Sequence, residues 1–340
     1  MPLHAAIAAI DYALPARRLT NAEIARRFPE WGVDKISAKT GIETRHLAAP
    51  GETAADLAVA AAERLLARPG LNRHAVDYLI FCTQTPDYFL PASACLIQHR
   101  LGLSTACGAI DINQGCSGFV YGLGLAQALI TSGQARQVLL ITAETYSRHM
   151  LPEDKTVQTI FGDAAAATLL VAQSRPSLSH FVYGTDGSGA GSLIVRGGAG
   201  RALAGGEAVV AAPHDALWMD GPEVFAFTLR AVPGLVAGIL AEAGGMTFAD
   251  IDLLVMHQAN RFMLDALAQR LKCPEEKLLR CYAEMGNTVS STIPIALAEA
   301  QRSGRLKPGM RLLLAGFGVG YSWAGCLVDW VSPFTEEETT

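Results

Sequence analysis

Charged residues are scarce in this chain: only 17% of its 340 residues are Asp, Glu, Lys or Arg, whereas 50% are hydrophobic. The formal net charge of −5 provides no basic excess, which argues against general nucleic-acid binding. No apolar run approaches the roughly 20 residues that a membrane span needs. We therefore expect a protein that binds no nucleic acid and enters no membrane, with a core large enough for two domains or one large α/β unit.

Paired cysteines are also missing. The chain has seven cysteines, which are scattered, odd in number and free of Cys-x-x-Cys pairs. A zinc site and a disulfide framework are therefore not expected, and the pattern indicates a reducing cytoplasm. The first four residues lack a basic signal-peptide start, so export is not expected. No metal, flavin or nucleotide motif is present, and we expect no metal and no cofactor.

One cysteine, Cys116, stands in an unusual context. It follows an apolar, β-prone run that ends in a glycine, and it precedes residues 117–132, which predict a helix. A cysteine at such a strand-to-helix turn lies near the positive end of the helix dipole, which favours the reactive thiolate. A small buried cysteine in a glycine-rich core is the alternative, and this segment alone does not decide between them.

Two later segments place polar side chains at similar junctions. His257 ends an apolar strand, and Asn287 follows a glycine turn before a helix of small residues. Taken alone, a His at a strand end is more often structural, and an Asn after Gly is ordinary turn chemistry. A Cys, a His and an Asn that each lie at an element junction together fit nucleophilic acyl transfer.

The two halves of the chain resemble each other at a spacing of about 174 residues. Residues 76–82 match residues 251–257, and residues 137–142 match residues 311–316, while Cys116 lies 171 residues before Asn287. A duplication explains three matched landmarks better than the general similarity among α/β proteins does. It would bring Cys116 and Asn287 to equivalent junctions near a pseudo-twofold axis.

The duplication divides the chain into two domains, 1–173 and 174–340, with the boundary near residues 173–177. The strands are continuous apolar runs, as in sheets that are covered on both faces. Alternating strands and helices predict mostly parallel pairing with right-handed crossovers. The expected helices include about residues 52–68, 117–132, 221–244, 261–271 and 291–303.

Six stretches carry a further pattern: residues 39–42, 111–119, 161–163, 257–260, 286–288 and 316–323. Each is weak alone, but together they are specific, and they follow in order over nearly the whole chain. In them the chain resembles the β-ketoacyl-acyl-carrier-protein synthase III family of the thiolase-fold superfamily. The resemblance implies an α/β, thiolase-like fold with two duplicated halves in a layered αβαβα sandwich.

The resemblance also implies a mechanism. Cys116 would attack an acyl thioester and hold the acyl group, after which His257 and Asn287 would serve decarboxylation of a malonyl thioester and carbon–carbon bond formation. Neutral N–H donors from the His ring and the Asn amide suit the enolate oxygen that forms. A separate oxyanion hole would use the backbone N–H of Cys116 and one from Gly318, Val319 or Gly320, where glycines allow close approach.

The implied partners are an acyl-CoA or acyl-ACP donor, malonyl-ACP or malonyl-CoA, an acyl carrier protein, and a second copy of the chain in a homodimer. Lys39, Lys155 and Arg261 are the candidates for donor or carrier binding. An acidic carrier protein would need a local basic patch, since the chain as a whole is acidic.

Several positions depart from the family pattern around the donor. Many relatives have a Trp shortly before the 39–42 stretch, and this Trp stacks on the coenzyme A adenine. In this chain Trp31 lies ten residues before Gly41, and Lys35 falls near the position of the family's Trp. Lys155 replaces an adenine-contacting Arg and is a poorer stacking partner. The Arg usual after residues 257–260 falls on Phe262, with Arg261 one residue earlier. These changes favour a carrier-bound donor or an atypical acyl-CoA.

Another departure concerns the acyl pocket. The loop concerned is residues 87–91. In typical relatives a Phe before the proline of this loop reaches across the dimer and caps the pocket, whereas this chain has Leu90 before Pro91. The smaller Leu90 predicts that the pocket accepts more than acetyl. The alternative is that Phe89 or Tyr88 takes over as the cap.

Three functions remain at this point. A condensing enzyme of fatty-acid or secondary-metabolite and polyketide biosynthesis is the leading one. An acyltransferase that forms an ester or amide is the second, but such relatives often replace the Asn, so Asn287 favours condensation. A non-catalytic partner subunit is the third, and it would usually lose the cysteine that this chain keeps at Cys116. The acyl donor, the extender and the pathway stay open.

Overall fold

The computed structural model describes residues 3–200 and 216–331. The first two of the four N-terminal residues on which we base the absence of an export signal lie outside the described residues. The helices are α1 Asn21–Arg27, α2 Val33–Thr40, α3 Ala54–Leu66, α4 Ser93–Arg100, α5 Gly118–Thr131, α6 Lys155–Gln158, α8 Gly221–Glu242, α9 Arg261–Leu271 and α10 Thr292–Arg302. The strands are β1 His4–Ala13, β2 Arg17–Thr20, β3 Thr44–Leu47, β4 Tyr78–Cys82, β5 Gly108–Ile112, β6 Gln137–Glu144, β7 Ala164–Gln173, β8 Leu178–Thr185, β9 Leu193–Val195, β10 Leu217–Met219, β11 Leu253–Met256, β12 Arg311–Gly318 and β13 Ser322–Asp329.

Two sheets share one strand order. The first runs β1-β7-β6-β4-β5 and the second runs β8-β13-β12-β11. In both, the first two neighbouring pairs are antiparallel and the third pair is parallel. The equivalent strands β4 and β11, and β6 and β12, are the segments that match in the sequence. The duplicated α/β fold is therefore confirmed.

The expectation of mostly parallel pairing is wrong. In the described residues only β4 with β5, β4 with β6 and β11 with β12 pair in parallel, whereas the other strand pairs are antiparallel. The reason is that β12 leads to β13 by a short turn, and the link from β6 to β7 holds only the short helix α6 and a 3-10 turn, not a crossover helix along the sheet. A continuous apolar run identifies a strand covered on both faces, but it does not give the direction of its neighbour.

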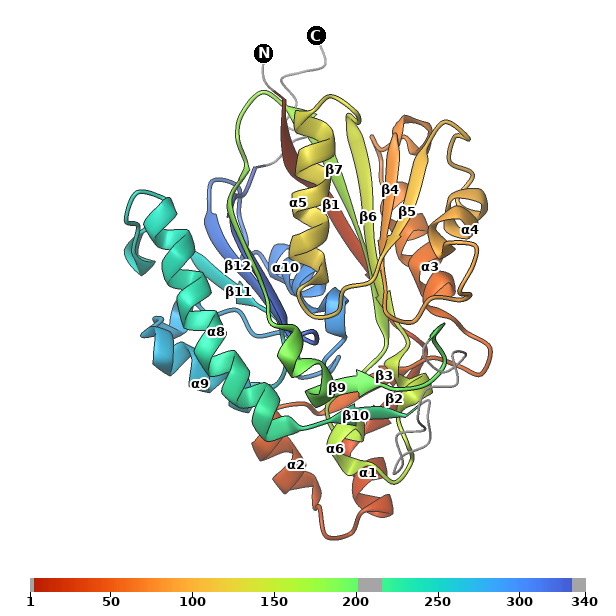
Figure 1. The fold of residues 1–340 in the computed structure, drawn as a ribbon, viewed down its shortest axis with the longest axis vertical. Helices are drawn as coiled ribbons and strands as arrows, with labels where there is room; N and C mark the ends of the chain where they lie inside the picture. The colour runs from red at the N-terminus through yellow and green to blue at the C-terminus, as the bar shows by residue number, and fades with distance from the viewer. Residues whose placement is uncertain (1–2, 201–215, 332–340) are drawn as a thin grey trace.

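The sheets and helices alternate in five layers. Apolar side chains of α5 and α10 share one core cluster with side chains from both sheets, so these two helices form the middle layer (Figure 1). Helices α3 and α4 cover the outer face of the first sheet, and α8 and α9 cover the outer face of the second. Along a strand, successive residues serve opposite layers: Ile80 faces the middle layer, and Leu79 and Phe81 face the outer one. The αβαβα arrangement is confirmed.

All five expected helices form, as α3, α5, α8, α9 and α10, with ends within about two residues of those expected. One expectation from composition needs correction, because α8 is long and apolar enough to cross a membrane by length and composition. In the structure α8 packs on β8, β12 and β13, and Val232, Leu235, Val236 and Ile239 enter the core. These contacts are those of a core helix.

The boundary expected near residue 173 coincides with the end of β7, and β8 begins at Leu178 in the other sheet. The division of the chain into domains 1–173 and 174–340 stays a prediction, because the middle helices of both halves share a single core.

Candidate active site

Cys116 lies in the turn between β5 and α5, directly before Ser117, the residue that precedes the first turn of the helix. Its side chain is 5% exposed. Burial raises the pKa of the Cys116 thiol to about 12, although backbone N–H groups of Val319 and of Cys116 itself act in the opposite direction. The expectation that the helix terminus leaves a thiolate is therefore not met, because desolvation of the charged sulfur dominates.

Strand β12 of the second half packs directly on this turn of the first half. A Cβ atom added to Gly318 would lie 2.7 Å from the Cys116 sulfur, and one added to Gly316 would lie 2.8 Å from the Cys116 carbonyl oxygen. Only glycine permits backbone to approach the nucleophile this closely. The next residue, Val319, brings its N–H to the sulfur, whereas Gly320 packs against Ser322. Among the expected oxyanion-hole groups, Cys116 and Val319 have N–H groups near the sulfur.

His257 follows β11 and is buried. Its Nδ1 atom lies 2.8 Å from Thr292 Oγ1, and its ring meets the edge of Phe317 with ring centroids 5.7 Å apart. Burial lowers the pKa of His257 to about 3, so the ring is neutral at physiological pH. A neutral ring with one N–H is what the expected role as a hydrogen-bond donor requires.

Asn287 is held on both sides. Its backbone N–H donates to the Ile160 carbonyl at 2.9 Å, and its carbonyl accepts from Gly162 N–H at 3.0 Å. Its side-chain Oδ1 accepts from Val289 N–H at 2.9 Å, which leaves the Nδ2 amide group 3.4 Å from His257 Nε2. The donor end of Asn287 and the outer nitrogen of His257 therefore lie side by side.

The structure thus brings His257 and Asn287 into contact. Cys116 belongs to the same packed apolar cluster as Val289 and Val319, which flank this pair and the end of β12. The chemical inventory of the site is a thiol, two backbone N–H groups beside the sulfur, and two neutral N–H donors nearby.

Thr292, the first residue of α10, was missed from the sequence. Its hydroxyl lies 2.8 Å from His257 Nδ1 and 3.0 Å from the Val289 carbonyl. The hydroxyl donates to this carbonyl, which leaves its oxygen to accept from Nδ1–H; the tautomer with the proton on Nε2, which the expected donor role needs, requires the hydroxyl to turn and donate to Nδ1 instead. A hydroxyl residue at the start of the helix after the Asn287 turn was the available signal.

Glu144 was also missed. This buried residue at the end of β6 accepts hydrogen bonds from Gln84 N–H at 3.0 Å, from Ser290 Oγ at 3.0 Å and from Thr85 Oγ1 at 3.2 Å. Burial raises the pKa of its carboxyl to about 8. Since Ser290 belongs to the Asn287 turn, Glu144 joins the two halves beneath the site. A Glu at the end of an apolar run resembles a surface residue in the sequence.

A cavity of about 880 Å³ opens beside these groups. Tyr88 and Phe89 line it, together with Gln84, Tyr146, Leu193, Leu217, Val319 and Gly320 among others. Leu90 is 82% exposed and does not line the cavity of its own chain. Of the three candidates for the acyl pocket, Tyr88 and Phe89 therefore line this cavity within one chain, and their role at the acyl group stays a prediction.

The donor-binding candidates separate into two places. The ammonium groups of Lys39 and Lys155 lie 5.2 and 5.6 Å from the centre of the Trp31 ring, and that of Lys35 lies 5.4 Å from it. Arg261, at the start of α9, instead packs against Gly41, where an added Cβ would lie 2.7 Å from the Arg261 Cβ. Although Trp31 lies far from the family position in sequence, the structure puts it beside Lys155.

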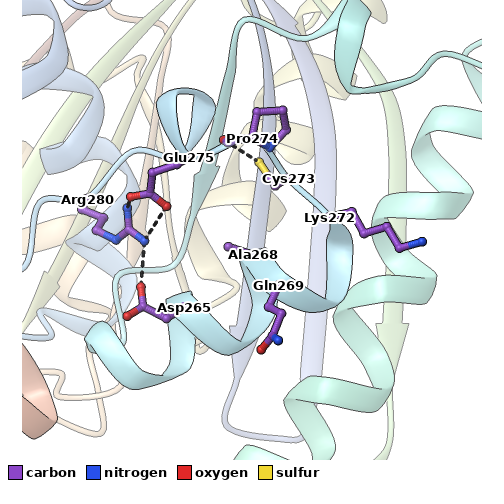
Figure 2. A pocket seen from close by; sticks show the side chains of 8 residues that line it. All are labelled: Asp265, Ala268, Gln269, Lys272, Cys273, Pro274, Glu275 and Arg280. Carbon is purple, nitrogen blue, oxygen red and sulfur yellow. Dashed lines mark hydrogen bonds and ion pairs between the residues drawn. The ribbon is translucent and has the colours of Figure 1, made fainter.

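A second hollow, of about 620 Å³, lies at the end of α9 and holds none of the expected site residues (Figure 2). Its Arg280 is paired with Asp265 at 2.7 Å and also with Glu275. These pairs neutralise the charge that a ligand would need. Within residues 3–200 and 216–331 no group of three His, Cys, Asp or Glu side chains could hold a metal ion.

Comparison with known proteins identifies the family. Residues 110–187 match the model for 3-oxoacyl-[acyl-carrier-protein] synthase III, and residues 240–330 match the model for its C-terminal part. A β-ketoacyl-[acyl-carrier-protein] synthase III from Neisseria meningitidis is 38% identical over 330 residues, which cover 96% of this chain and 99% of that protein. The chain belongs to the β-ketoacyl-acyl-carrier-protein synthase III family.

Solved structures agree. A 3-oxoacyl-(acyl-carrier-protein) synthase III is 50% identical, with a TM-score of 0.93 over 96% of this chain and 100% of that one. The priming β-ketosynthase of the R1128 polyketide pathway is 30% identical, with a TM-score of 0.88 over 98% of both chains. The family resemblance and the thiolase-like fold are confirmed, and the chain is a synthase III-like condensing enzyme of fatty-acid or polyketide synthesis.

Proposed function

We propose that this protein is an acyltransferase that loads an acyl group on Cys116 and then condenses it with a malonyl-type thioester. In the first half-reaction the Cys116 sulfur attacks the donor thioester, and the donor thiol leaves with the proton that Cys116 loses. In the second, the malonyl group loses carbon dioxide, and the resulting enolate carbon attacks the acyl carbonyl. The Cys116 thiol leaves and regains a proton.

The contact between His257 and Asn287 carries this proposal. An enolate oxygen is anionic, and two preorganised N–H donors in a buried site stabilise it strongly. Because burial lowers the pKa of His257 to about 3, the ring supplies a hydrogen bond without a positive charge. Nothing in a simple acyl transfer to an oxygen or nitrogen nucleophile needs this second pair of donors.

The N–H groups of Cys116 and Val319 form the oxyanion hole for the acyl carbonyl in this proposal, because they lie near the sulfur. Gly318, next to Val319, lets the strand end reach the sulfur, whereas Gly320, on the other side of Val319, packs against Ser322. The two oxyanions of the two half-reactions would then be stabilised by different donors.

The proposed donor is an acyl-CoA or acyl-ACP, and the proposed extender is malonyl-ACP or malonyl-CoA. Lys35, Lys39 and Lys155 gather around Trp31 on an acidic chain, and although Lys155 is paired with Glu30 at 2.8 Å, the group suits the phosphates of coenzyme A or the acidic surface of a carrier protein. The meeting of Trp31 with these lysines supports coenzyme A more than the sequence alone does. Arg261 is a weaker candidate, because its stem packs on Gly41.

We further propose a cytoplasmic homodimer. Tyr88, Phe89 and Leu90 are all exposed in the single chain, and apolar side chains of this size are costly to leave in water. Strand β5 is the unpaired edge of the first sheet, with the apolar Ile110 partly exposed on it. Light scattering at micromolar concentration tests the dimer, and a monomer of 36.0 kDa would contradict it.

The condensing activity is tested by incubating the protein with acyl-CoA and malonyl-ACP and identifying the products by mass spectrometry. We expect 3-oxoacyl-ACP and one carbon dioxide per product. Acylation of Cys116 without carbon dioxide release, but with transfer to hydroxyl or amine acceptors, would replace condensation with ester or amide formation.

A further inference from the structure

Polar side chains form one wall of the cavity beside Cys116. The Tyr146 hydroxyl, which is 6% exposed as a residue, donates to Gln84 Oε1 at 2.5 Å. Gln84 Nε2 in turn donates to Asn113 Oδ1 at 3.2 Å. All three residues line the cavity. A pocket that receives only an alkyl chain has no need of such a chain of hydrogen-bonding groups.

This wall lies close to the nucleophile. A Cβ atom added to Gly115, the residue before Cys116, would lie 2.5 Å from Gln84 Oε1 and 2.4 Å from Val319 Cγ1. Tyr146 belongs to the same packed cluster as Cys116, with its ring 5.4 Å from that of Phe161. An acyl group on the sulfur that enters this cavity would therefore meet Gln84 and Tyr146.

Some N–H donors of the Gln84 and Asn113 amides have no protein acceptor among the described residues. A Gln side-chain amide has two N–H groups, and Gln84 uses one of them on Asn113. Within the described part of the chain, Asn113 Nδ2 donates to no protein group. The oxygen of Tyr146 also keeps a lone pair, since its hydroxyl acts as the donor to Gln84. Asn113 is exposed, so water reaches its amide, but an alkyl chain packed over Gln84 and Tyr146 would cover their polar groups without pairing them, which is unfavourable.

Another part of the lining is apolar. Leu193, Leu217 and Val319 line the same cavity and are largely buried in the cluster around Cys116. These residues can receive the carbons of the acyl chain, while Gln84 and Asn113 contribute amide groups to the same lining. The cavity is therefore amphipathic, with its polar side near the thioester end of the substrate.

We propose that the acyl group accepted by Cys116 carries an oxygen substituent, oxo or hydroxyl, near its thioester end, and that Gln84, Asn113 and Tyr146 select it. The inference rests on the proposed function, since it describes the acyl group of the first half-reaction. The substituent oxygen accepts a hydrogen bond from the Gln84 or Asn113 amide. A hydroxyl substituent can also donate to the Tyr146 oxygen, whereas an oxo group cannot.

The test compares donors of equal length. The rate at which Cys116 gains acyl mass is measured by intact-protein mass spectrometry with hexanoyl-CoA, 3-oxohexanoyl-CoA and 3-hydroxyhexanoyl-CoA. At least one oxygenated donor should load about tenfold faster than hexanoyl-CoA, the effect of about one well-formed hydrogen bond. Equal rates, or faster loading of hexanoyl-CoA, would overturn the proposal.

Two variants locate the selectivity. Gln84→Leu keeps the size of the side chain but removes its donors, so it should lose the preference and load hexanoyl-CoA faster. Tyr146→Phe removes one hydroxyl and should narrow the preference for the 3-hydroxy donor, which keeps the proposal testable if Gln84→Leu does not fold. Gln134→Leu makes the same change at an exposed position whose side chain donates to Ser132 Oγ, and it should keep the wild-type preference.

Failure of this inference differs from failure of the proposed function. If hexanoyl-CoA loads Cys116 well and Gln84→Leu leaves the rate ratios unchanged, the oxygenated substrate is wrong but acylation at Cys116 stands. If none of the thioesters adds mass to Cys116, the first half-reaction itself is wrong and this inference falls with it.

Discussion

The two middle helices, α5 and α10, begin in the same way in the two halves of the molecule. The residue before each first turn, Ser117 or Ser291, makes no capping hydrogen bond with its side chain. Each hydroxyl instead reaches the opposite half: Ser117 Oγ lies 2.7 Å from Ser322 Oγ, and Ser291 Oγ lies 2.9 Å from Thr142 Oγ1. Each half therefore holds the start of the other half's helix.

We call the segments that lead into α5 and α10 the first and the second junction. The residues at these two junctions differ. The first half places Cys116 directly before Ser117, whereas the second half places Asn287 before a short 3-10 turn, Val289–Ser291. At the matching strand ends, the first half has Cys82, whose buried thiol donates to the Gln114 carbonyl, and the second half has His257. One duplicated frame thus offers a nucleophile on one side and hydrogen-bond donors on the other, as a reaction in two steps requires.

Removing the amide at the second junction should have the largest effect. Asn287→Ala deletes one donor to the enolate oxygen, and we expect decarboxylation and condensation to fall by about 10²–10³. Acylation of Cys116 should continue, because that step uses the first junction. Rates of carbon dioxide release and of acylation, measured separately, check this. Asn72→Ala, at a surface turn, serves as the control. Condensation at the wild-type rate in Asn287→Ala would refute the role of this donor.

Glu144 connects the two halves beneath the site, and its contribution to folding stability should depend on pH. Because burial raises its pKa from 4.5 to about 8, the folded protein holds a proton that the unfolded chain has released between these values. Folding stability therefore decreases as pH rises through this window, by about 2 kcal/mol between pH 6 and pH 8.

Glu144→Gln should remove that slope, whereas Glu63→Gln, at the exposed pair with Arg73, should keep it. Denaturant unfolding at several pH values measures the slope for each protein. Equal slopes in wild type and Glu144→Gln would mean that Glu144 is ionised in the folded protein.

Thr292 should affect only the second junction. The proposed donor role of His257 Nε2 requires the Thr292 hydroxyl to turn from the Val289 carbonyl and donate to Nδ1. Thr292→Val removes this hydroxyl, so the ring proton should lie on Nδ1 and Nε2 should lack a hydrogen. Condensation should fall at least about tenfold, while acylation of Cys116 persists. Thr292→Ser keeps the hydroxyl and should retain both the wild-type tautomer of the His257 ring and the wild-type condensation rate. Nitrogen NMR of the His257 ring reports the tautomer, and an unchanged tautomer in Thr292→Val would show that Thr292 does not set it.

The smallest effect is expected at the acyl pocket. Leu90→Phe adds volume that an occupied pocket absorbs only with strain, so relative acylation should shift toward acetyl by about two- to fivefold. Acylation rates with donors from acetyl to decanoyl measure the shift. Coinciding profiles for the two proteins would leave Tyr88 or Phe89, which line the cavity of their own chain, as the cap.

Much of the fold was predictable because it depends on buried apolar strands. The matches of residues 76–82 with 251–257 and of 137–142 with 311–316 correctly paired β4 with β11 and β6 with β12. Strand direction was not predictable, since the antiparallel returns of β7 and β13 leave no mark on a strand that is apolar on both faces.

The site was predictable only in part. The contact of His257 with Asn287 joins a strand-end residue and a turn residue that the sequence had singled out in the second half, but acylation of Cys116 and the roles assigned to all three residues remain predictions. The high pKa of the Cys116 thiol was not foreseen, because local sequence shows the helix terminus and hides the burial. Glu144, Thr292, Gln84 and Tyr146 were missed for a similar reason, as their importance lies in partners that are distant in sequence.

The assignment of one half-reaction to each junction is tested most directly by intact-protein mass spectrometry. The mass is measured after addition of an acyl donor and again after addition of a malonyl thioester. Wild type should gain the acyl mass and then lose it as product forms. Asn287→Ala should gain the mass and keep it, and Cys116→Ala should gain none. Acyl mass on Cys116→Ala, or its release from Asn287→Ala at the wild-type rate, would contradict the assignment of one half-reaction to each junction.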